Sequence, residues 1–380
     1  MNGTALVWIG SCATTLAALA MGYTLTAWLA LRQARRAQHR PRVELPPTTI
    51  LKPLRGAEHG LYERLRSFCE QPGSSLQIVC GVRDPADPAL GAVRRLQAEF
   101  PQLDLQIAAC PARHGASDKV SNLLNMMPLA RHDFLVIADS DVSVPPDYLE
   151  RVIPPLLDEA IGIVTCPYRG CPRRGVWSLL GSLFINEWFM PSVRVASMFG
   201  SREFAFGATI ALRRETLARI GGFAAVADQL PDDYRLGELT RRLGLRTVLS
   251  EVEVETGVDE ATCGDLVRHE LRWLRTIRTV RPLGYTLAGV TFGVPAALLA
   301  TVLARGSALT MAMLAVTVAA RFMINSSPRK PYSLLTQLWL VALNDLLAFA
   351  LWCWSFTARE VHWRDARYRV GRDGTAHPIP

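Results

Sequence analysis

The chain has 380 residues, of which 49% are hydrophobic and 20% charged, and its formal net charge is +8. Much of the positive charge flanks apolar segments, which argues against a nucleic-acid-binding protein. The eight cysteines form no CxxC pair and lack histidines at ligand spacing, so the sequence predicts neither a zinc site nor a disulfide framework.

The first predicted element is an apolar segment, Ala5 to Leu31, that contains no charged residue. It is long enough to cross a bilayer, and no lysine or arginine precedes it as in a signal peptide, so we expect an uncleaved anchor. Five arginines follow directly: Arg32, Arg35, Arg36, Arg40 and Arg42. The positive-inside rule therefore predicts an anchor with a basic juxtamembrane segment in residues 1–46 and a cytoplasmic domain after it.

Residues 47–284 alternate between short apolar runs and segments with helical periodicity. The strand-like runs are 48–51, 76–82, 103–109, 134–138 and 162–166, and the helical segments include 61–69, 88–100, 119–127 and 145–157. This alternation predicts an α/β domain whose mostly parallel sheet carries helices on both faces. Ligands of such sheets bind at the carboxyl ends of the strands.

Within this domain, residues 175–200 are apolar and aromatic but interrupted by Asn186, Glu187, Pro191 and Arg194. The segment is a poor membrane span. We expect an amphipathic helix on the membrane surface, with a buried helix of the domain as a nearly equal alternative.

Residues 285–358 are again apolar and contain three segments: Tyr285–Leu303, Ser307–Ile324 and Leu334–Phe356. The third carries Asp345, which indicates a functional charge, a helix–helix partner or an interfacial position. Three full spans would export the tail, residues 359–380, yet its arginines favour the cytoplasm. We therefore expect one segment to be re-entrant or to lie along the interface.

Acidic residues lie at three places where strands end or helices begin. They are Asp84 after the run 76–82, Asp139 and Asp141 after the run 134–138, and Asp232 and Asp233 before the helical segment 234–244. A fourth feature, residues 268–278, carries Arg268, Arg272, Arg275 and Arg278 around Trp273, which we expect to be exposed. Each feature alone is equally typical of a loop, an N-cap or an interfacial anchor.

Together these features suit sugar transfer from a nucleotide diphosphate. Carboxylates hold a divalent cation that neutralises the leaving diphosphate, and arginine binds phosphate in a bidentate manner. A separate carboxylate acts as the general base that deprotonates the attacking hydroxyl. The sequence contains candidates for all three roles.

The order Asp84, Asp139-Ser140-Asp141, Asp233 and "HELRW" (269–273) resembles the D, DxD, D, (Q/R)xxRW pattern of inverting GT-A glycosyltransferases. The chain is most similar to the ceramide glucosyltransferase branch. The similarity covers nearly the whole chain, including residues 50–56, 82–89, 119–142, 206–215 and 363–375. Within that branch, residues 268–285 resemble bacterial hopanoid-biosynthesis glycosyltransferases, which are taken to transfer N-acetylglucosamine from its UDP donor to bacteriohopanetetrol.

For the donor, the resemblance implies that Asp84 contacts the uracil or ribose, in a pocket that Lys52 and Pro53 line. It places Lys119 and Asn122 near the donor. Asp141 would bind the metal, Mg²⁺ or Mn²⁺, together with the diphosphate. Asp139 would lie near the sugar or ribose beside the metal.

For the acceptor, the resemblance implies that Asp233 is the catalytic base, with Asp232 as the less suited neighbour. Arg272 and Trp273 would close over the diphosphate and the acceptor, and Gly207 would lie in a loop near the acceptor. His269 departs from the pattern, because a neutral imidazole cannot supply the fixed charge of arginine. Its role beside Arg268 at the donor is therefore open.

The main expectation is a multi-pass protein of the bacterial inner membrane that transfers N-acetylglucosamine to a hopanoid. Ceramide or another lipid alcohol is an alternative acceptor that needs the same catalytic residues. A processive polysaccharide synthase shares the motifs but needs more spanning helices. A transporter or scaffold ranks last, because the polar residues lie in the soluble domain. The sequence carries no signal for oligomeric state.

Overall fold

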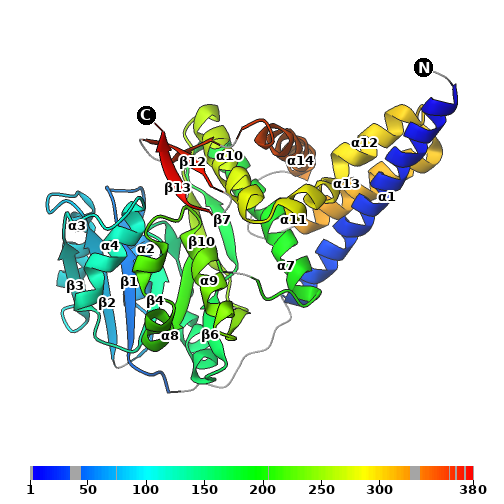
Figure 1. The fold of residues 1–380 in the computed structure, drawn as a ribbon. Coiled ribbons are helices and arrows are strands. Elements are labelled where there is room, and N and C mark those ends of the chain that lie inside the picture. Colours follow the sequence, from blue (N-terminus) through cyan, green and yellow to red (C-terminus); the bar gives the residue numbers. More distant parts are fainter. Residues whose placement is uncertain are drawn as a thin grey trace.

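A computed structural model describes residues 3–34, 44–73, 75–203, 205–325, 334–358, 360–363, 366–371 and 374–379 (Figure 1). The predicted basic residues Arg35, Arg36, Arg40 and Arg42 lie outside this part. At the centre is a seven-stranded sheet of order β3-β2-β1-β4-β8-β6-β9. Its strands are β1 (Thr48–Pro53), β2 (Leu76–Val82), β3 (Asp104–Ala109), β4 (Phe134–Ala138), β6 (Ile161–Thr165), β8 (Thr209–Arg213) and β9 (Arg246–Leu249).

The sheet is mostly parallel, as predicted. β4, β1, β2 and β3 pair in parallel, whereas β8 runs antiparallel between β4 and β6. Consecutive buried residues of each strand face opposite sides, so Ile50 and Leu51 belong to two different apolar clusters. One cluster includes α2 (Leu61–Cys69), α3 (Ala89–Glu99) and α5 (Tyr148–Val152), and the other includes α4 (Asp118–Met126), α8 (Arg214–Arg219) and α9 (Asp232–Arg242).

The predicted helix 145–157 is shorter than expected. α5 ends at Val152 and a 3₁₀ helix, Pro154–Leu157, replaces its last part. Pro154 and Pro155 lack the backbone N–H that an α-helix needs there, and each disfavours helical geometry in the residue before it.

A second, three-stranded sheet was not predicted. β10 (Val254–Val258) lies between β5 (Val142–Ser143), to which it is antiparallel, and β7 (Tyr168–Pro172), to which it is parallel. Because β5 begins directly after Asp141, this pairing brings the acidic turn at the end of β4 against β10.

Residues 175–198 pack against both the central domain and the C-terminal helices. They form α6 (Gly175–Leu183), a π-helical turn (Phe184–Phe189) and α7 (Met190–Met198). Phe184 and Trp188 are buried in an apolar cluster with Leu271 and Phe292. The segment thus has the extensive burial of the alternative that we considered, and its contact with a membrane surface stays a prediction.

The long helix α1 (Gly3–Ala34) packs against α12 (Gly293–Leu303) and α13 (Ala308–Asn325), and these three form the arm on the right of Figure 1. In the described part of the chain, Trp8–Ala34 is the one helix long and apolar enough to cross a membrane. A second candidate is bent by 62° between Pro282–Thr291 and Gly293–Leu303. This bent pair is either a broken span or a re-entrant loop, and a re-entrant segment is one of the two outcomes that we expected in this region.

A buried ion pair stabilises this bend. Asp345 of α14 (Leu334–Ser355) lies 2.8 Å from Arg321 of α13, and their side chains are 3% and 2% exposed. Asp345 also accepts a hydrogen bond from the Val294 N–H (2.8 Å), and Arg321 donates to the Thr291 carbonyl. The pair thus satisfies backbone groups that the break leaves without helical partners. Among the roles considered for Asp345, this is the helix–helix partner.

The tail forms a small antiparallel sheet of β11 (Glu360–Trp363), β12 (Ala366–Val370) and β13 (Ala376–Ile379). It lies beside α10 (Cys263–Val280) of the central domain (Figure 1). The tail and the central domain therefore lie on the same side of any membrane that α1 crosses. The number of crossings that residues 285–358 make stays a prediction.

Candidate functional site

Three side chains from different elements meet at the carboxyl end of β4. Lys119 of α4 places its Nζ 2.7 Å from Asp139 Oδ1 and 3.5 Å from Asp232 Oδ2. A Cβ on Gly207 would lie 3.2 Å from Asp233 Oδ2, 3.3 Å from Lys119 Nζ and 3.5 Å from Asp139 Oδ2. The space in front of Gly207 is therefore a small polar recess, which any side chain at this position would fill.

Asp233 is held in this recess by two backbone donors. Its Oδ2 accepts from the Gly207 N–H and its Oδ1 from the Tyr234 N–H, both at 2.7 Å. Burial, and then the charge of Asp232, raise the pKa of Asp233 to about 6, although Lys119 opposes this. A carboxylate with this pKa is ionised at neutral pH and still basic enough to accept a proton. Asp232 instead pairs with Lys119, which makes it the less suited base.

The acidic turn, residues 139–141, is fixed through its backbone. Lys52 donates to the Asp139 carbonyl, Arg64 Nε to the Ser140 carbonyl (3.0 Å) and the Gly257 N–H to the Asp141 carbonyl (2.9 Å). The carboxylate of Asp141 accepts from the Thr256 hydroxyl at 2.8 Å. Burial, followed by the charge of Asp139, raises the pKa of Asp141. Two carboxylates in this environment favour a bound cation.

The donor set fits a divalent metal only in part. In the described ranges, no group of three or more His, Cys, Asp or Glu residues could hold a metal ion. Asp139 and Asp141 therefore suit a hard cation that takes its remaining oxygen ligands from a diphosphate and water, as Mg²⁺ commonly does.

Lys52 contacts the acidic turn, residues 139–141, from the interior of the domain. Its side chain is fully buried, and its ammonium nitrogen lies over the ring of Phe68, 4.2 Å from the ring centroid. Burial lowers the pKa of Lys52 to about 8. The described contacts make Lys52 a support of the turn, and Pro53 beside it is half-buried. That these two residues line a nucleotide pocket stays a prediction.

The other residues predicted to bind the donor lie around the end of β2. Asp84 is exposed, and its carboxylate accepts the Ala86 N–H at 2.8 Å. Asn122 is buried and donates to the Gly81 carbonyl at 2.7 Å, which holds α4 against β2. Asp84 is thus accessible to a ligand, whereas the described contact of Asn122 is structural.

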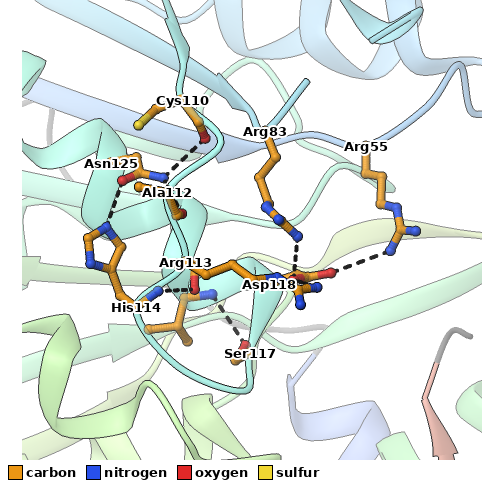
Figure 2. Close-up of polar contacts among 11 residues, drawn as sticks. Arg55, Arg83, Cys110, Ala112, Arg113, His114, Ser117, Asp118 and Asn125 are labelled. Carbon is orange, nitrogen blue, oxygen red and sulfur yellow. Dashed lines mark hydrogen bonds and ion pairs between the residues drawn. The ribbon is translucent and has the colours of Figure 1, made fainter. Parts of the chain in front are cut away.

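Sequence reasoning missed a group of arginines at this edge. Arg83, Arg113 and Arg55 lie 2.6, 3.0 and 3.6 Å from the carboxylate of Asp118 at the start of α4 (Figure 2). Arg55 and Arg83 follow β1 and β2, and Arg113 follows β3. Three guanidinium groups around one carboxylate make this edge of the sheet electropositive. Their positions just after predicted strands were the signal that could have found them.

α10 carries the remaining predicted residues. Trp273 is half-buried, not exposed as we expected, because its ring packs against those of Tyr168 and Phe189, with centroid distances of 6.2 and 5.9 Å. His269 contacts the Trp273 ring edge-on, and its Nδ1 hydrogen bonds to the buried Glu260. This bond orients the imidazole.

The arginines of α10 do not act together. Arg275 donates to the Glu360 carbonyl (2.6 Å) and Arg278 to the Ala358 carbonyl (2.6 Å), so these two hold the chain after α14. Arg268 pairs with Asp265 at 2.6 Å. Arg272, which the resemblance placed over the diphosphate, is half-buried on the helix and stays the candidate for that role.

A cavity of about 410 Å³ adjoins Asp141. Its lining comes from the β1–α2 loop, the end of β10 and the first turns of α10, and comprises Glu58, His59, Arg64, Asp141, Arg173, Gly257, Asp259, Glu260, Asp265, Arg268 and His269. Arg64 Nη1 and Arg173 Nε both lie 3.2 Å from the point that a Cβ on Gly257 would occupy. The cavity therefore presents two guanidinium groups next to the acidic turn.

Comparisons with known proteins concern the family and the fold of the chain. The sequence profile of Glycosyl transferase family 21 matches residues 12–376. Ceramide glucosyltransferase 1 of Caenorhabditis elegans is 24% identical over 213 residues, which cover 55% of this chain and 45% of that protein. The ceramide glucosyltransferase of Candida albicans is 34% identical over 106 residues, 25% of this chain and 20% of that protein. The chain spans about half the length, or less, of these curated relatives.

Among solved structures, a mannosyltransferase from Pyrobaculum calidifontis in complex with GDP-Man and Mn²⁺ superposes with a TM-score of 0.53. The two sequences are 20% identical, and the match covers 90% of this chain and 98% of the other. The likeness shows a shared fold and confirms the predicted GT-A-like α/β domain.

Proposed function

The chain belongs to glycosyl transferase family 21, and from this premise we propose that it transfers a hexose, with inversion, from a UDP-sugar to the hydroxyl of a membrane lipid. The observation that carries the proposal is the polar recess at Gly207. There a basic carboxylate, Asp233, lies next to the acidic turn, with Lys119 between them. Direct displacement needs a proton acceptor on one side of the sugar and charge compensation on the other.

In this proposal Asp233 accepts the proton of the lipid hydroxyl. The hydroxyl oxygen forms a bond to the anomeric carbon, the bond from that carbon to the diphosphate oxygen breaks, and UDP leaves. The Gly207 and Tyr234 N–H groups hold the carboxylate so that it keeps its orientation through the reaction. Lys119 limits the rise in the pKa of Asp233, which keeps the base ionised at neutral pH.

The leaving diphosphate belongs at the acidic turn. Asp139 and Asp141 would hold a divalent cation, Mg²⁺ or Mn²⁺, which would neutralise the charge of the diphosphate. The guanidinium groups of Arg173 in the adjoining cavity and of Arg272 on α10 suit the phosphate oxygens, whereas Arg64 donates to the Ser140 and His59 carbonyls and to Glu58. Asp84 and the arginines around Asp118 suit the nucleoside end of the donor.

For the acceptor, the curated relatives favour ceramide over the hopanoid that we expected first, because those proteins are named ceramide glucosyltransferases. We therefore place glucose transfer to a ceramide-type lipid first. N-acetylglucosamine transfer to a hopanoid polyol is the second candidate, which the stretch 268–285 favours.

The proposed arrangement in the membrane follows the domains expected from the sequence. Residues 1–46 anchor a cytoplasmic catalytic domain, 47–284, on the bacterial inner membrane. α12 and α13 lie beside α1 as a hairpin whose turn lies near Gly10 of α1, and α12, with 11 residues, is too short to cross a bilayer by itself. Residues 359–380 then return to the catalytic domain. An accessibility map of single cysteines at Arg305 and Thr375 tests this topology, because the two should lie on opposite sides.

The acceptor assay is a two-by-two design. Membranes that contain the protein receive UDP-glucose or UDP-N-acetylglucosamine with either ceramide or a hopanoid polyol, and the glycolipid is identified by mass spectrometry. One donor–acceptor pair should yield product and the Asp233→Asn variant should yield none. Formation of a free polysaccharide instead would support the synthase alternative.

A further inference from the structure

The described residues between 360 and 379 contact the loop that leads to the candidate base. Thr375 pairs with Gln229 in an antiparallel bridge. The Leu230 N–H donates to the Gly374 carbonyl (3.1 Å), and the Ala376 N–H donates to the Asp228 carbonyl (2.9 Å). The tail thus binds the backbone of residues 228–230, which lead directly into α9 and Asp233.

Apolar packing strengthens this contact. Leu230 is 8% exposed and shares a small cluster with Val361, Val370 and Ala376 of the tail, which are 1%, 3% and 4% exposed. Because each strand of the tail contributes one of these side chains, the small sheet must be formed for Leu230 to be covered.

The same loop also touches the start of α4. The Ser117 N–H donates to the Ala227 carbonyl (2.9 Å), and the Ala116 N–H donates to the Asp228 carboxylate (2.8 Å). Ser117 caps α4, and Lys119 is the second residue of that helix. On its other side, the tail accepts a hydrogen bond from Arg275, three residues after Arg272 on α10. The tail therefore contacts, directly or through one loop, the segments that carry Lys119, Asp233 and Arg272.

We propose that the small sheet of β11, β12 and β13 is a positioning element that holds the base Asp233 and the neighbouring Lys119 in register with α10. This inference rests on the proposed function, since it assigns the tail a part in the same reaction. The tail does not touch the reacting atoms. Its effect is to fix the loop 227–231, which the tail covers with backbone and apolar contacts.

Gly374 offers a way to disturb this contact alone. Its φ is +86°, and a Cβ there would lie 2.9 Å from Gln229 Oε1 and 3.1 Å from Pro231 Cγ. The glutamine side chain can move away, but the proline ring is rigid, so Gly374→Ala pushes on the residue just before Asp232. Gly244 is the matched control, because its φ is +78° and a Cβ there meets nothing within 4 Å. Gly244→Ala carries a comparable backbone strain without the contact.

The experiment compares three full-length variants with the wild type. Gly374→Ala should lower the transfer rate at saturating substrates by about tenfold or more, because small displacements of catalytic groups have effects of this size. Its Kd for UDP should stay near that of the wild type, and Gly244→Ala should retain most of the wild-type rate. Ala376→Pro removes the N–H that donates to Asp228 and should repeat the loss if Gly374→Ala fails to fold.

Hydrogen exchange supplies a readout that does not depend on turnover. Amides of residues 228–234 should exchange faster in Gly374→Ala and Ala376→Pro, but not in Gly244→Ala. If both tail variants match Gly244→Ala in rate and in exchange, the positioning role is overturned. If the wild type transfers no sugar, the proposed function fails, while the exchange result still decides whether the tail fixes the loop.

Discussion

Replacing Asp233 by asparagine tests the base most sharply. Asparagine is close in size but cannot accept the proton of the attacking hydroxyl. General-base catalysis contributes roughly 10²- to 10⁴-fold to a rate, so the transfer rate of Asp233→Asn should fall by that factor. The Kd for UDP should change little, because Asp233 lies on the acceptor side of the acidic turn in the proposed mechanism.

The pKa of Asp233 sets the pH dependence of the wild type. Burial and the charge of Asp232 raise this pKa to about 6. The ionised form is the active one, so activity is lost as the pH falls through this value. With a pKa of about 6, the ionised fraction rises roughly tenfold between pH 5 and pH 7, whereas an aspartate at its usual pKa of about 3.9 would be ionised throughout.

The assay measures kcat over KM for the lipid acceptor from pH 4.5 to 8.5, under conditions in which chemistry is rate-limiting. Asp232→Asn is a second variant for this assay, since it removes the neighbouring negative charge but keeps the base. The acid limb of its pH profile should move to lower pH. A flat profile down to pH 5 in the wild type, or wild-type turnover in Asp233→Asn, would remove Asp233 from the role of base.

Three further predictions concern the metal site, the ion pair and the electropositive edge. Asp141→Ala should abolish metal-dependent donor binding, measured by calorimetry with UDP and Mn²⁺, and full activity in excess chelator would contradict the metal proposal. Asp345→Asn keeps an acceptor for the Val294 N–H but leaves Arg321 buried without its counter-charge. The free energy of unfolding in detergent should therefore fall by about 3–5 kcal/mol. A loss below about 1 kcal/mol would show that the pair is dispensable. Arg83→Ala should weaken binding of UDP more than that of pyrophosphate, and equal weakening would place the arginines at the diphosphate instead.

Much of the central sheet was predictable from local pattern. The runs that became β1, β2, β4 and β6 are apolar, rich in β-branched residues and buried on both faces, so their identity depends little on context. β5, β7 and β10 are short or only partly buried, and they form because they pair with one another. No periodicity in a single segment reveals such pairing.

The position of the bend before α12 could not be predicted, for a related reason. Residues 285–303 are uniformly apolar, and the groups that stabilise the break, Arg321 and Asp345, lie on later helices. A charge in an apolar segment indicated a partner, but the sequence could not say that this partner would be a broken helix.

For the site, the sequence predicted the acidic residues but not their relations. Asp139 and Asp233 were identifiable from strand ends and family resemblance. The position of Lys119 between Asp139 and Asp232 depends on how α4 docks on the sheet. The four arginines of α10 are spaced three or four residues apart and therefore share one side of the helix, so spacing alone could not say which of them reaches a diphosphate. Arg275 and Arg278 lie on the face that holds the tail.

The central claim is that Asp233 catalyses inverting transfer from a UDP-sugar to a membrane lipid. The most direct measurement is the structure of the product that purified protein forms from an α-linked UDP-sugar and the preferred lipid, determined by NMR of the anomeric proton. We expect a β-linked glycolipid whose formation stops in Asp233→Asn. An α-linked product, or equal product from the variant, would contradict it.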